Sequence, residues 1–463
     1  MTKQELQLLS SAISDAKKLI GWNEVNEDRD TRVIFDIVRN FVEKKNVLCY
    51  GGTAINALLD EKDRFYDENY DLPDYDFFSM KAIDHAKELA NIYARKGYLV
   101  EAKSGQHHGT YKVFVNFMPV ADVTQCDSRI FQRLWNEKMI KSKIKYVPPH
   151  FLRWSMYLEL SRPMGDVSRW EKVFKRLTLL DAQYPLKKSD KRCTIKSLSR
   201  QFHSPYHDEK QFHLALKSIL IDQNVIFFGY GAFSEYAHAY NKQKKTYAAD
   251  FEVISHDPNY ASCANMVKQR LEADGYRPIY LDHYNNVDEF IPCYYEVRLG
   301  QSIVAHIYKS ESCYSYNMVM DKDLKKNMRV ASIETMFSMH FIFFYKNDHY
   351  NSRMRLLCTA EKLLEMQKKN RHETGGLLKR FQIKCVGRHE GKRDILEKKY
   401  RKMLELYKGH PQYDEWFLNY KPRPRVSRTL KTKMTSDSSR TSRTVRTSRT
   451  MRRGRTTRKR RRR

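Results

Sequence analysis

Three aspartates carry the chemistry that a divalent metal ion needs. Asp74 and Asp76 are two residues apart, so both carboxylates point to the same face if they lie on a β-strand. Asp122 follows in an apolar segment, where a charge needs a partner. Carboxylate oxygens suit Mg²⁺ or Mn²⁺. We predict that all three aspartates are catalytic metal ligands of an in-line nucleotidyl transfer, in which one metal ion activates the attacking oxygen and another stabilises the leaving pyrophosphate.

The spacing Asp-x-Asp is a weak signal by itself, because a solvated strand end explains it more simply. A glycine pair, Gly51-Gly52, precedes Asp74 by 23 residues and leads through Thr53 into a helical pattern. Glycines let a phosphate reach the backbone N–H groups at a helix N-terminus. Considered alone, the glycines are better explained by an ordinary turn. Together with the aspartates, they favour a nucleotide-binding turn made by Gly51, Gly52 and Thr53.

Three basic residues are further candidates for nucleotide binding. Lys112 precedes the strand of the third aspartate, so its ammonium could reach a triphosphate, although a solvent-facing lysine is an equal alternative. Arg169 and Lys172 fall on one helix face at a spacing of i, i+3 and could contact phosphate or base. A surface ion pair with Glu171 or Asp166 explains them equally well.

The segments that must position these residues alternate between helical and extended patterns. The first 45 residues and residues 81–96 have helical spacing, and a short apolar run leads into the glycine pair. Residues 111–115 and 120–124 are predicted as two strands around a turn at Pro119. The order strand, turn, helix, strand, helix, hairpin is typical of an α/β or α+β fold.

The same order of elements recurs about 180 residues further along the chain, which favours two tandem copies of one domain. The second copy differs at the positions that matter. A bulky tyrosine blocks the approach of a phosphate, a neutral imidazole is a poor Mg²⁺ ligand, and a glutamate repels a triphosphate. We therefore predict a second copy without catalytic activity that serves packing and RNA contact. It holds Asp250, Glu252, His306, Tyr230 and Glu296 where the first copy has Asp74, Asp76, Asp122, Gly52 and Lys112.

The net charge of +30 is concentrated at the C-terminus, where the 43 residues from Lys421 hold nineteen Lys and Arg and one acid. This tail is low in complexity and is predicted to be disordered. Its charge would bind RNA phosphates without sequence preference. The arginines that recur every third residue, our candidate RNA-binding residues, are Arg440, Arg443, Arg446, Arg449, Arg452 and Arg455.

These patterns predict five segments along the chain. They are an N-terminal helical segment (1–45), a catalytic domain (46–145), a helical segment packing on it (146–200), a degenerate copy with C-terminal helices (201–420) and the basic tail (421–463).

The eight cysteines show no zinc-like spacing, so we expect reduced thiols in an intracellular protein. The N-terminus lacks the pattern of a secretory signal. The most apolar stretch, 339–345, is far shorter than the ~20 residues of a membrane span. Hydrophobic residues make up 41% of the chain, which is ample for packed cores. We expect a soluble protein without a membrane partner.

The motifs also resemble a known family. Gly51-Gly52-Thr53, Asp74-x-Asp76 and a later strand aspartate are similar to the DNA polymerase β-like nucleotidyltransferase signature. The segments Gly109–Thr124 and Met156–Leu177 resemble the poly(A) polymerase catalytic subunit of nucleocytoplasmic large DNA viruses of the poxvirus, mimivirus and asfarvirus types. The resemblance extends from about residue 30 to residue 420, is strongest at 46–187 and leaves out the tail.

This resemblance implies an α+β fold in which a catalytic nucleotidyltransferase domain precedes a degenerate copy. It implies template-independent addition of AMP from ATP to mRNA 3′ ends, with ATP and the RNA 3′ end as partners. It also implies a virus-encoded protein in the host cytoplasm (the viral factory) or packaged in the virion, working as a homodimer or with a separate processivity subunit. Nuclear entry through the terminal basic cluster is a further expectation.

Two alternatives to this function stay open. One is a nucleotidyltransferase of another base specificity, such as a terminal uridylyltransferase, because no residue of the sequence identifies an adenine-binding pocket. The other is a non-catalytic RNA-binding scaffold. The intact set of Asp74, Asp76 and Asp122 argues against the scaffold, because the second copy has lost part of the same set.

Overall fold

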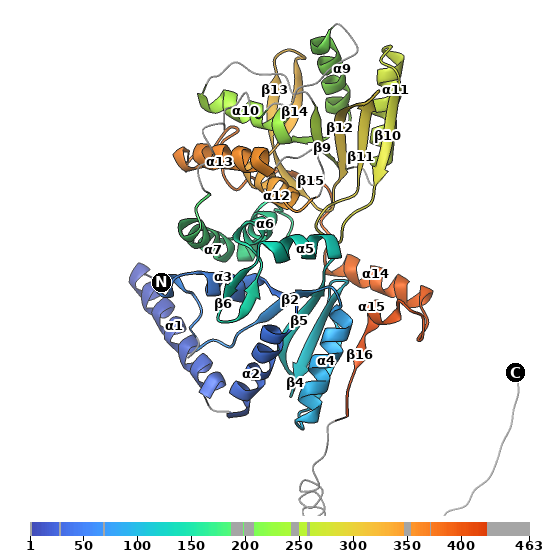
Figure 1. Cartoon of the computed structure of the whole chain (residues 1–463). Helices are drawn as coiled ribbons and strands as arrows, with labels where there is room; N and C mark the ends of the chain where they lie inside the picture. Colours follow the sequence, from blue (N-terminus) through green and yellow to red (C-terminus); the bar gives the residue numbers. More distant parts are fainter. Residues whose placement is uncertain are drawn as a thin grey trace, which may run out of the picture.

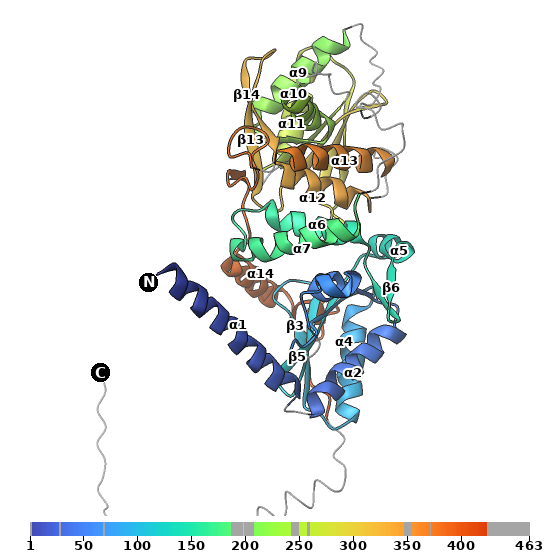
Figure 2. The ribbon, with the colours of Figure 1, turned by 90° about the vertical axis from the view of Figure 1, so that its left-hand side faces the viewer.

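The computed structural model describes residues 2–26, 29–67, 70–186, 198, 208–241, 250–256, 260–346, 353–370 and 372–423. Two lobes lie one above the other, each built on a β-sheet, with α6 (Pro149–Leu160) and α7 (Trp170–Gln183) between them (Figure 1). Helix α1 (Lys3–Asn26) runs obliquely along the side of the first lobe (Figure 2). The predicted α+β fold is thereby confirmed.

The sheet of the first lobe has the strand order β16-β3-β4-β5-β2-β1-β7-β6. Strand β5 is parallel to β2 and antiparallel to β4. Helices α2 and α4 pack against this sheet, and the buried Ile34, Val38, Phe41 and Val42 of α2 recur at helical spacing. The strands are β1 (Leu48–Cys49), β2 (Tyr75–Ser79), β3 (Val100–Ser104), β4 (Thr110–Val115), β5 (Met118–Gln125), β6 (Met139–Lys141), β7 (Ile144–Tyr146) and β16 (Asn419–Tyr420). The helices are α2 (Arg29–Lys44), α3 (Gly51–Leu58), α4 (Ala82–Arg95) and α5 (Ser128–Asn136), with α14 (Lys392–Glu405) and α15 (Tyr413–Phe417) returning to this lobe.

The second lobe repeats the first. Its sheet has the order β10-β11-β12-β9-β8-β14-β13-β15, and its first five strands match β3-β4-β5-β2-β1 in order and in direction. The predicted tandem copy is therefore confirmed at the level of topology. The strands are β8 (Ile226–Phe228), β9 (Phe251–Ser255), β10 (Ile279–Tyr284), β11 (Tyr294–Leu299), β12 (Ser302–Lys309), β13 (Tyr314–Asp321), β14 (Lys326–Ala331) and β15 (Cys385–Val386). The helices are α9 (Glu209–Asp222), α10 (Gly229–Asn241), α11 (Tyr260–Ala273), α12 (Ile333–Phe343) and α13 (Arg353–Lys369).

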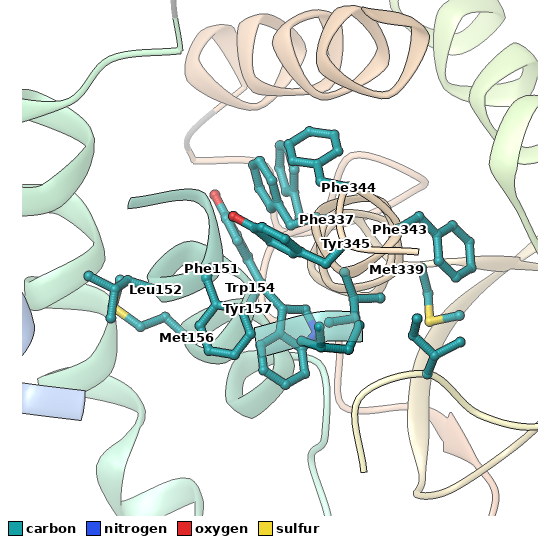
Figure 3. Close-up of a cluster of buried hydrophobic side chains, with 14 of the residues drawn as sticks. Phe151, Leu152, Trp154, Met156, Tyr157, Phe337, Met339, Phe343, Phe344 and Tyr345 are labelled. Atoms are coloured by element: carbon teal, nitrogen blue, oxygen red, sulfur yellow. The ribbon is translucent and has the colours of Figure 1, made fainter. Parts of the chain in front are cut away.

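An aromatic cluster joins the two lobes (Figure 3). Tyr157 of α6 stacks on Phe337 of α12 with ring centroids 4.5 Å apart, and Phe151 packs edge-on against Tyr345. We expected the helices after the first copy to pack on that copy. Helix α6 contacts it through Phe151, which packs edge-on against Phe78, and it also packs on α12 of the second lobe, because its buried residues lie on more than one side of the helix.

Truncating the centre of this cluster should destabilise the whole chain. Phe151 is 1% exposed, and we expect Phe151→Ala to lower the free energy of unfolding by about 3–5 kcal/mol through lost burial and a residual cavity. Phe117→Ala is the matched control, because that ring is 88% exposed and its loss should change stability by less than about 0.5 kcal/mol. Chemical denaturation measures both values, and equal stabilities of the two variants would contradict the assignment of Phe151 to a shared core.

Two predictions about local structure were wrong. We expected a turn at Pro119, but the turn lies at Asn116 and Phe117, which both have positive φ. Pro119 is the second residue of β5. The cysteines are not all reduced thiols, because Cys313 and Cys385 form a disulfide. Antiparallel pairing of β13 with β15 brings their Cα atoms to 5.3 Å across a sequence separation of 72 residues, which spacing motifs do not reveal.

No helix in the described ranges has both the length and the apolar character needed to cross a membrane.

Candidate active site

Strand register aligns the predicted side chains. Asp76 pairs with Asp122 across the parallel strands β2 and β5, and Lys112 pairs with Asp122 across the antiparallel strands β4 and β5. Directly paired residues project to the same face of a sheet, so these side chains form one row. Asp74 lies just before β2 and close to the row, since its charge raises the pKa of Asp76. The structure therefore brings the three predicted aspartates together.

Burial and crowding disfavour the ionised state of the carboxylates in this row. Burial, followed by the charges of Asp74 and Asp122, raises the pKa of Asp76 from its ordinary 3.8 to about 8. Burial and the charge of Asp122 also raise the pKa of Asp74, while Lys112 and Lys172 act in the opposite direction. A bound cation would relieve this repulsion between carboxylates.

Lys112 is part of the row rather than a lysine that only faces solvent. Its Nζ donates a hydrogen bond to Oδ2 of Asp122 and forms an ion pair with it. The Lys112 side chain keeps 38% of its surface exposed, against 19% for Asp122. The ammonium is therefore both the counter-ion of a carboxylate and accessible to an anionic ligand.

The raised pKa of Asp76 predicts a pH-dependent stability. In the folded state without divalent cations, Asp76 keeps a proton that the unfolded chain has lost, so stability should fall as pH rises from about 4 to about 8. Asp76→Asn removes the ionisable group. We therefore expect the free energy of unfolding of this variant to exceed that of wild type by roughly 1–3 kcal/mol at pH above 8 and to equal it near pH 4. Thermal unfolding in chelator measures it, with Asp84→Asn on the exposed side of α4 as the control. Identical pH profiles for wild type and Asp76→Asn would contradict the crowded carboxylate row.

Gly51 is required by the site itself. Its φ of +74° lies in the left-handed region, and Oδ2 of Asp76 occupies the space that a Cβ would need. At the same turn, the Thr53 hydroxyl donates to the backbone oxygen of Asp74 over 2.6 Å, so this side chain holds the segment before β2. Helix α3 begins at Gly51 without a side-chain cap, which leaves backbone N–H groups of its first turn for a phosphate.

Gly52 packs against two side chains from other segments of the chain. A Cβ there would lie 2.8 Å from Nη1 of Arg176 and 2.8 Å from the hydroxyl of Tyr66. Arg176 donates to that hydroxyl over 2.8 Å and stacks on the ring of Phe65 with 4.2 Å to its centroid. A phosphate at this turn would therefore meet a guanidinium held in place by two aromatic rings.

Helix α7 and Arg169, the residue directly before it, align three basic residues near the carboxylates. Arg169, Lys172 and Arg176 follow a spacing of three and four residues, which places them on one side of the helix. Burial and the charges of Arg176 and Arg169 lower the pKa of Lys172. Arg169 pairs with Glu159 at 3.3 Å, rather than with the predicted alternatives Glu171 or Asp166.

Sequence reasoning did not include Arg176 among the candidate site residues. Its position seven residues after Arg169 on the same helical face is the signal that could have found it. Its proximity to Gly52 is a tertiary contact over 124 residues of sequence, which the pattern does not contain.

The donor chemistry of the row fits hard divalent cations. It offers carboxylate oxygens, which Mg²⁺ and Mn²⁺ prefer, and burial followed by neighbouring negative charge raises the pKa of Asp74 and of Asp76. Among the described residues, no group of three or more His, Cys, Asp and Glu side chains is placed so that it could hold a metal ion as it stands. One oxygen of Asp122 accepts from Lys112 instead.

The second lobe reproduces this arrangement with altered residues. Glu252 pairs with His306 across β9 and β12, and Glu296 pairs with His306 across β11 and β12, in the register of the first lobe. Gly229 has φ +68°, and the Glu252 carboxylate fills the space beside it. The residue matches made from the sequence repeat are therefore confirmed, and the buried Glu252 lies beside Gly229 as Asp76 lies beside Gly51.

The tail arginines from Arg440 to Arg455 lie outside the described residues, so their RNA-binding role stays a prediction.

Comparison with known proteins supports the resemblance drawn from the motifs. Residues 36–166 match the family model of the poly(A) polymerase catalytic subunit. A protein of Acanthamoeba polyphaga mimivirus named as such a subunit is 33% identical over 203 residues, covering 42% of this chain and 34% of the relative. A protein of the same name from African swine fever virus (isolate Pig/Kenya/KEN-50/1950) is 28% identical over 176 residues, covering 36% and 37%. The chain thus spans about a third of the length of the curated relatives it matches.

A solved structure shares the fold over nearly the whole chain. The crystal structure of the Megavirus polyadenylate synthase is similar with a TM-score of 0.77, covering 94% of this chain and 89% of its own, at 20% sequence identity. Both lobes and the helices between them therefore have a counterpart in that structure.

Proposed function

We propose that the chain is a polynucleotide adenylyltransferase that adds AMP from ATP to mRNA 3′ ends without a template. The observation that carries this proposal is the row of Asp74, Asp76 and Asp122 beside the Gly51-Gly52 turn, inside the segment 36–166 that matches the family model. The names of the relatives support adenine as the base, and the mRNA acceptor is what the resemblance to the family implies.

In the proposed reaction, the RNA 3′ oxygen forms a bond to the α-phosphorus of ATP and the bond to pyrophosphate breaks. Divalent cations held by Asp74, Asp76 and Asp122 would activate the 3′ hydroxyl and stabilise the leaving pyrophosphate. The backbone N–H groups at the start of α3, which Gly51 makes accessible, would orient the triphosphate. Arg176 and Lys172 would neutralise its charge from the side of α7.

Arg176 should contribute to ATP binding without being needed for RNA binding. We expect Arg176→Gln to raise the KM for ATP about tenfold or more, because a charge-assisted hydrogen bond to phosphate is lost. Lys175→Gln on the same helix is the matched control, because Lys175 is 71% exposed and pairs with Glu171. Steady-state kinetics with varied ATP measure both, and equal KM values would remove Arg176 from the site.

Incubation of the full chain with a short single-stranded RNA and each NTP separately, with Mg²⁺ or Mn²⁺, tests the function directly. We expect long products with ATP and none of comparable length with the other nucleotides. Extension by UTP alone would favour a terminal uridylyltransferase, and no extension with any nucleotide would favour the scaffold.

The proposal extends to assembly and location. The relatives are named catalytic subunits, which supports an assembly with a separate processivity subunit. The alternative assembly is a homodimer, and light scattering distinguishes it from a monomer. A virus-encoded protein of the viral factory in the host cytoplasm, or packaged in the virion, would find viral mRNA as its acceptor.

A further inference from the structure

A cavity of about 1370 Å³ lies in the first lobe, apart from the carboxylate row. Its walls come from α1, α2, α3, the segments 61–67 and 70–73, and the turn between β6 and β7. Tyr75 lines it, and Tyr75 alternates with Asp74 and Asp76, so the cavity lies on the opposite side of β2 from the carboxylates. Its volume exceeds the roughly 300–1,000 Å³ of a small-molecule site, which favours a polymeric ligand.

The charge of the walls favours a polyanion. Six basic and four acidic residues line the cavity. Within the described part of the chain, the cations Lys17, Lys18, Arg64 and Lys141 form no ion pair. Each can therefore meet a phosphate without first leaving a carboxylate.

Two elements aim these cations at the cavity. Ser14, Lys17 and Lys18 lie on one face of α1, at i, i+3 and i+4. Across from them, Lys141 precedes a turn in which Ser142 and Lys143 have φ values of 47° and 67°. Residues with side chains rarely adopt that region, so the turn holds Lys141 at the wall at an energetic cost.

Aromatic rings supply the surfaces on which unpaired bases stack. Phe65, Tyr66 and Tyr70 line the cavity, and Tyr70 is 37% exposed. The amide oxygen of Asn56 accepts from the backbone N–H groups of Phe65 and Tyr66 at 2.8 and 3.0 Å, which holds this segment over α3. Cations interleaved with aromatic rings are the combination that binds single-stranded nucleic acid.

The cavity and the catalytic turn share a thin partition. Tyr66 lines the cavity with its ring, while its hydroxyl contacts Arg176 and faces Gly52. Thr53 also lines the cavity and bonds the backbone of Asp74. The cavity and the turn beside the carboxylates therefore adjoin at Tyr66 and Thr53.

We propose that this cavity binds single-stranded RNA upstream of the 3′ end. It contacts phosphates through Lys17, Lys18 and Lys141 and bases through Tyr70. The proposal rests on the proposed function for the identity of the strand, but not for the presence of the binding site.

Binding of a labelled oligoadenylate of about 20 nucleotides to the full-length protein, without ATP or metal, tests the site. We expect Lys17→Glu with Lys18→Glu to weaken binding at least about tenfold and to reduce the slope of log affinity against log salt by about 1.4, at 0.7 per phosphate contact. We expect Tyr70→Ala to weaken binding about fivefold or more with an unchanged salt slope, since it removes stacking rather than charge. Lys322→Glu with Lys325→Glu, in the turn between β13 and β14, changes the charge equally and should leave binding as in wild type.

Crosslinking with oligonucleotides that contain 4-thiouridine provides a second readout on the wild-type chain, which does not depend on the folding of any variant. We expect crosslinks on the peptides of segments 61–67 and 70–73 or of α1. Crosslinks confined to other segments, or equal weakening by the two charge-reversal pairs, would overturn the proposal. So would unchanged RNA affinity together with a raised KM for ATP in Lys17→Glu with Lys18→Glu, because the cavity would then take a small polyphosphate.

These outcomes are distinct from failure of the proposed function. A wild-type chain that binds RNA through this cavity but adds no nucleotide would leave the inference intact and remove the enzyme activity.

Discussion

Asp122→Asn should lower the rate of nucleotide addition by about a thousandfold or more. Asp122 is the centre of the row, paired with Asp76 on one side and with Lys112 on the other. Its loss removes one carboxylate of the proposed metal site and frees the ammonium of Lys112 from its ion pair. A metal-site ligand is worth several kcal/mol of transition-state stabilisation, and each 1.36 kcal/mol is about tenfold in rate.

Folding should survive this change, because the substitution removes one of three crowded anions and keeps the shape of the side chain. Primer extension under single-turnover conditions measures the rate, and circular dichroism checks the fold. Activity within about tenfold of wild type would show that the row is not the catalytic centre.

The second lobe offers a matched control for the same chemistry. Asp250→Asn with Glu252→Gln changes the two corresponding residues, in a lobe where Tyr230 and His306 stand at the positions of Gly52 and Asp122. We expect primer extension close to wild type. A folded double variant without activity would contradict the assignment of catalysis to the first lobe alone.

Deletion of residues 424–463 should have the second largest effect, on RNA affinity rather than on chemistry. The segment concentrates arginines among small polar residues and carries no aromatic side chain for stacking, so its contacts should be to phosphate. Each phosphate contact with a single strand contributes about 0.7 to the slope of log affinity against log salt. If about six to ten charges of the tail contact phosphates, its deletion should reduce the magnitude of that slope by about 4–7.

Products should shorten at moderate salt, while single-nucleotide addition persists at low salt because the carboxylate row is intact. Replacing the arginines from Arg440 to Arg455 by lysine keeps the charge and should keep the slope. Equal salt slopes for the full-length and truncated chains would instead favour a role of the tail in localisation or packaging.

Much of the site could be predicted because its signals are local. The alternation of strand residues placed Asp74 and Asp76 on one face, and the helical period placed Arg169 and Lys172 on another. The internal repeat also predicted the match of Glu252, His306 and Glu296 to the catalytic positions, which the strand registers confirm. The repeat could be found because elements recur in the same order.

Contacts between distant segments could not be predicted in this way. The disulfide of Cys313 with Cys385 and the packing of α6 between the lobes depend on which surfaces meet after folding. Asn116 and Phe117 adopt positive φ although neither is a glycine, so the sequence carries no glycine signal for this turn. The pattern therefore predicted the turn at Pro119.

The amino-acid sequence by itself predicted the type of chemistry, since the carboxylates, the glycine turn and their order depend on residue identity and on periods of two and 3.6. It also determined that the chain carries the domain twice and that the second copy has lost part of the set. Only the tertiary structure decided that Arg176 and Tyr66 cover Gly52, that Lys112 pairs with Asp122, and that a basic cavity lies behind the Gly51-Gly52 turn. The physical reason is that charge and close packing act through space, so their partners are set by the path of the chain and not by distance along it.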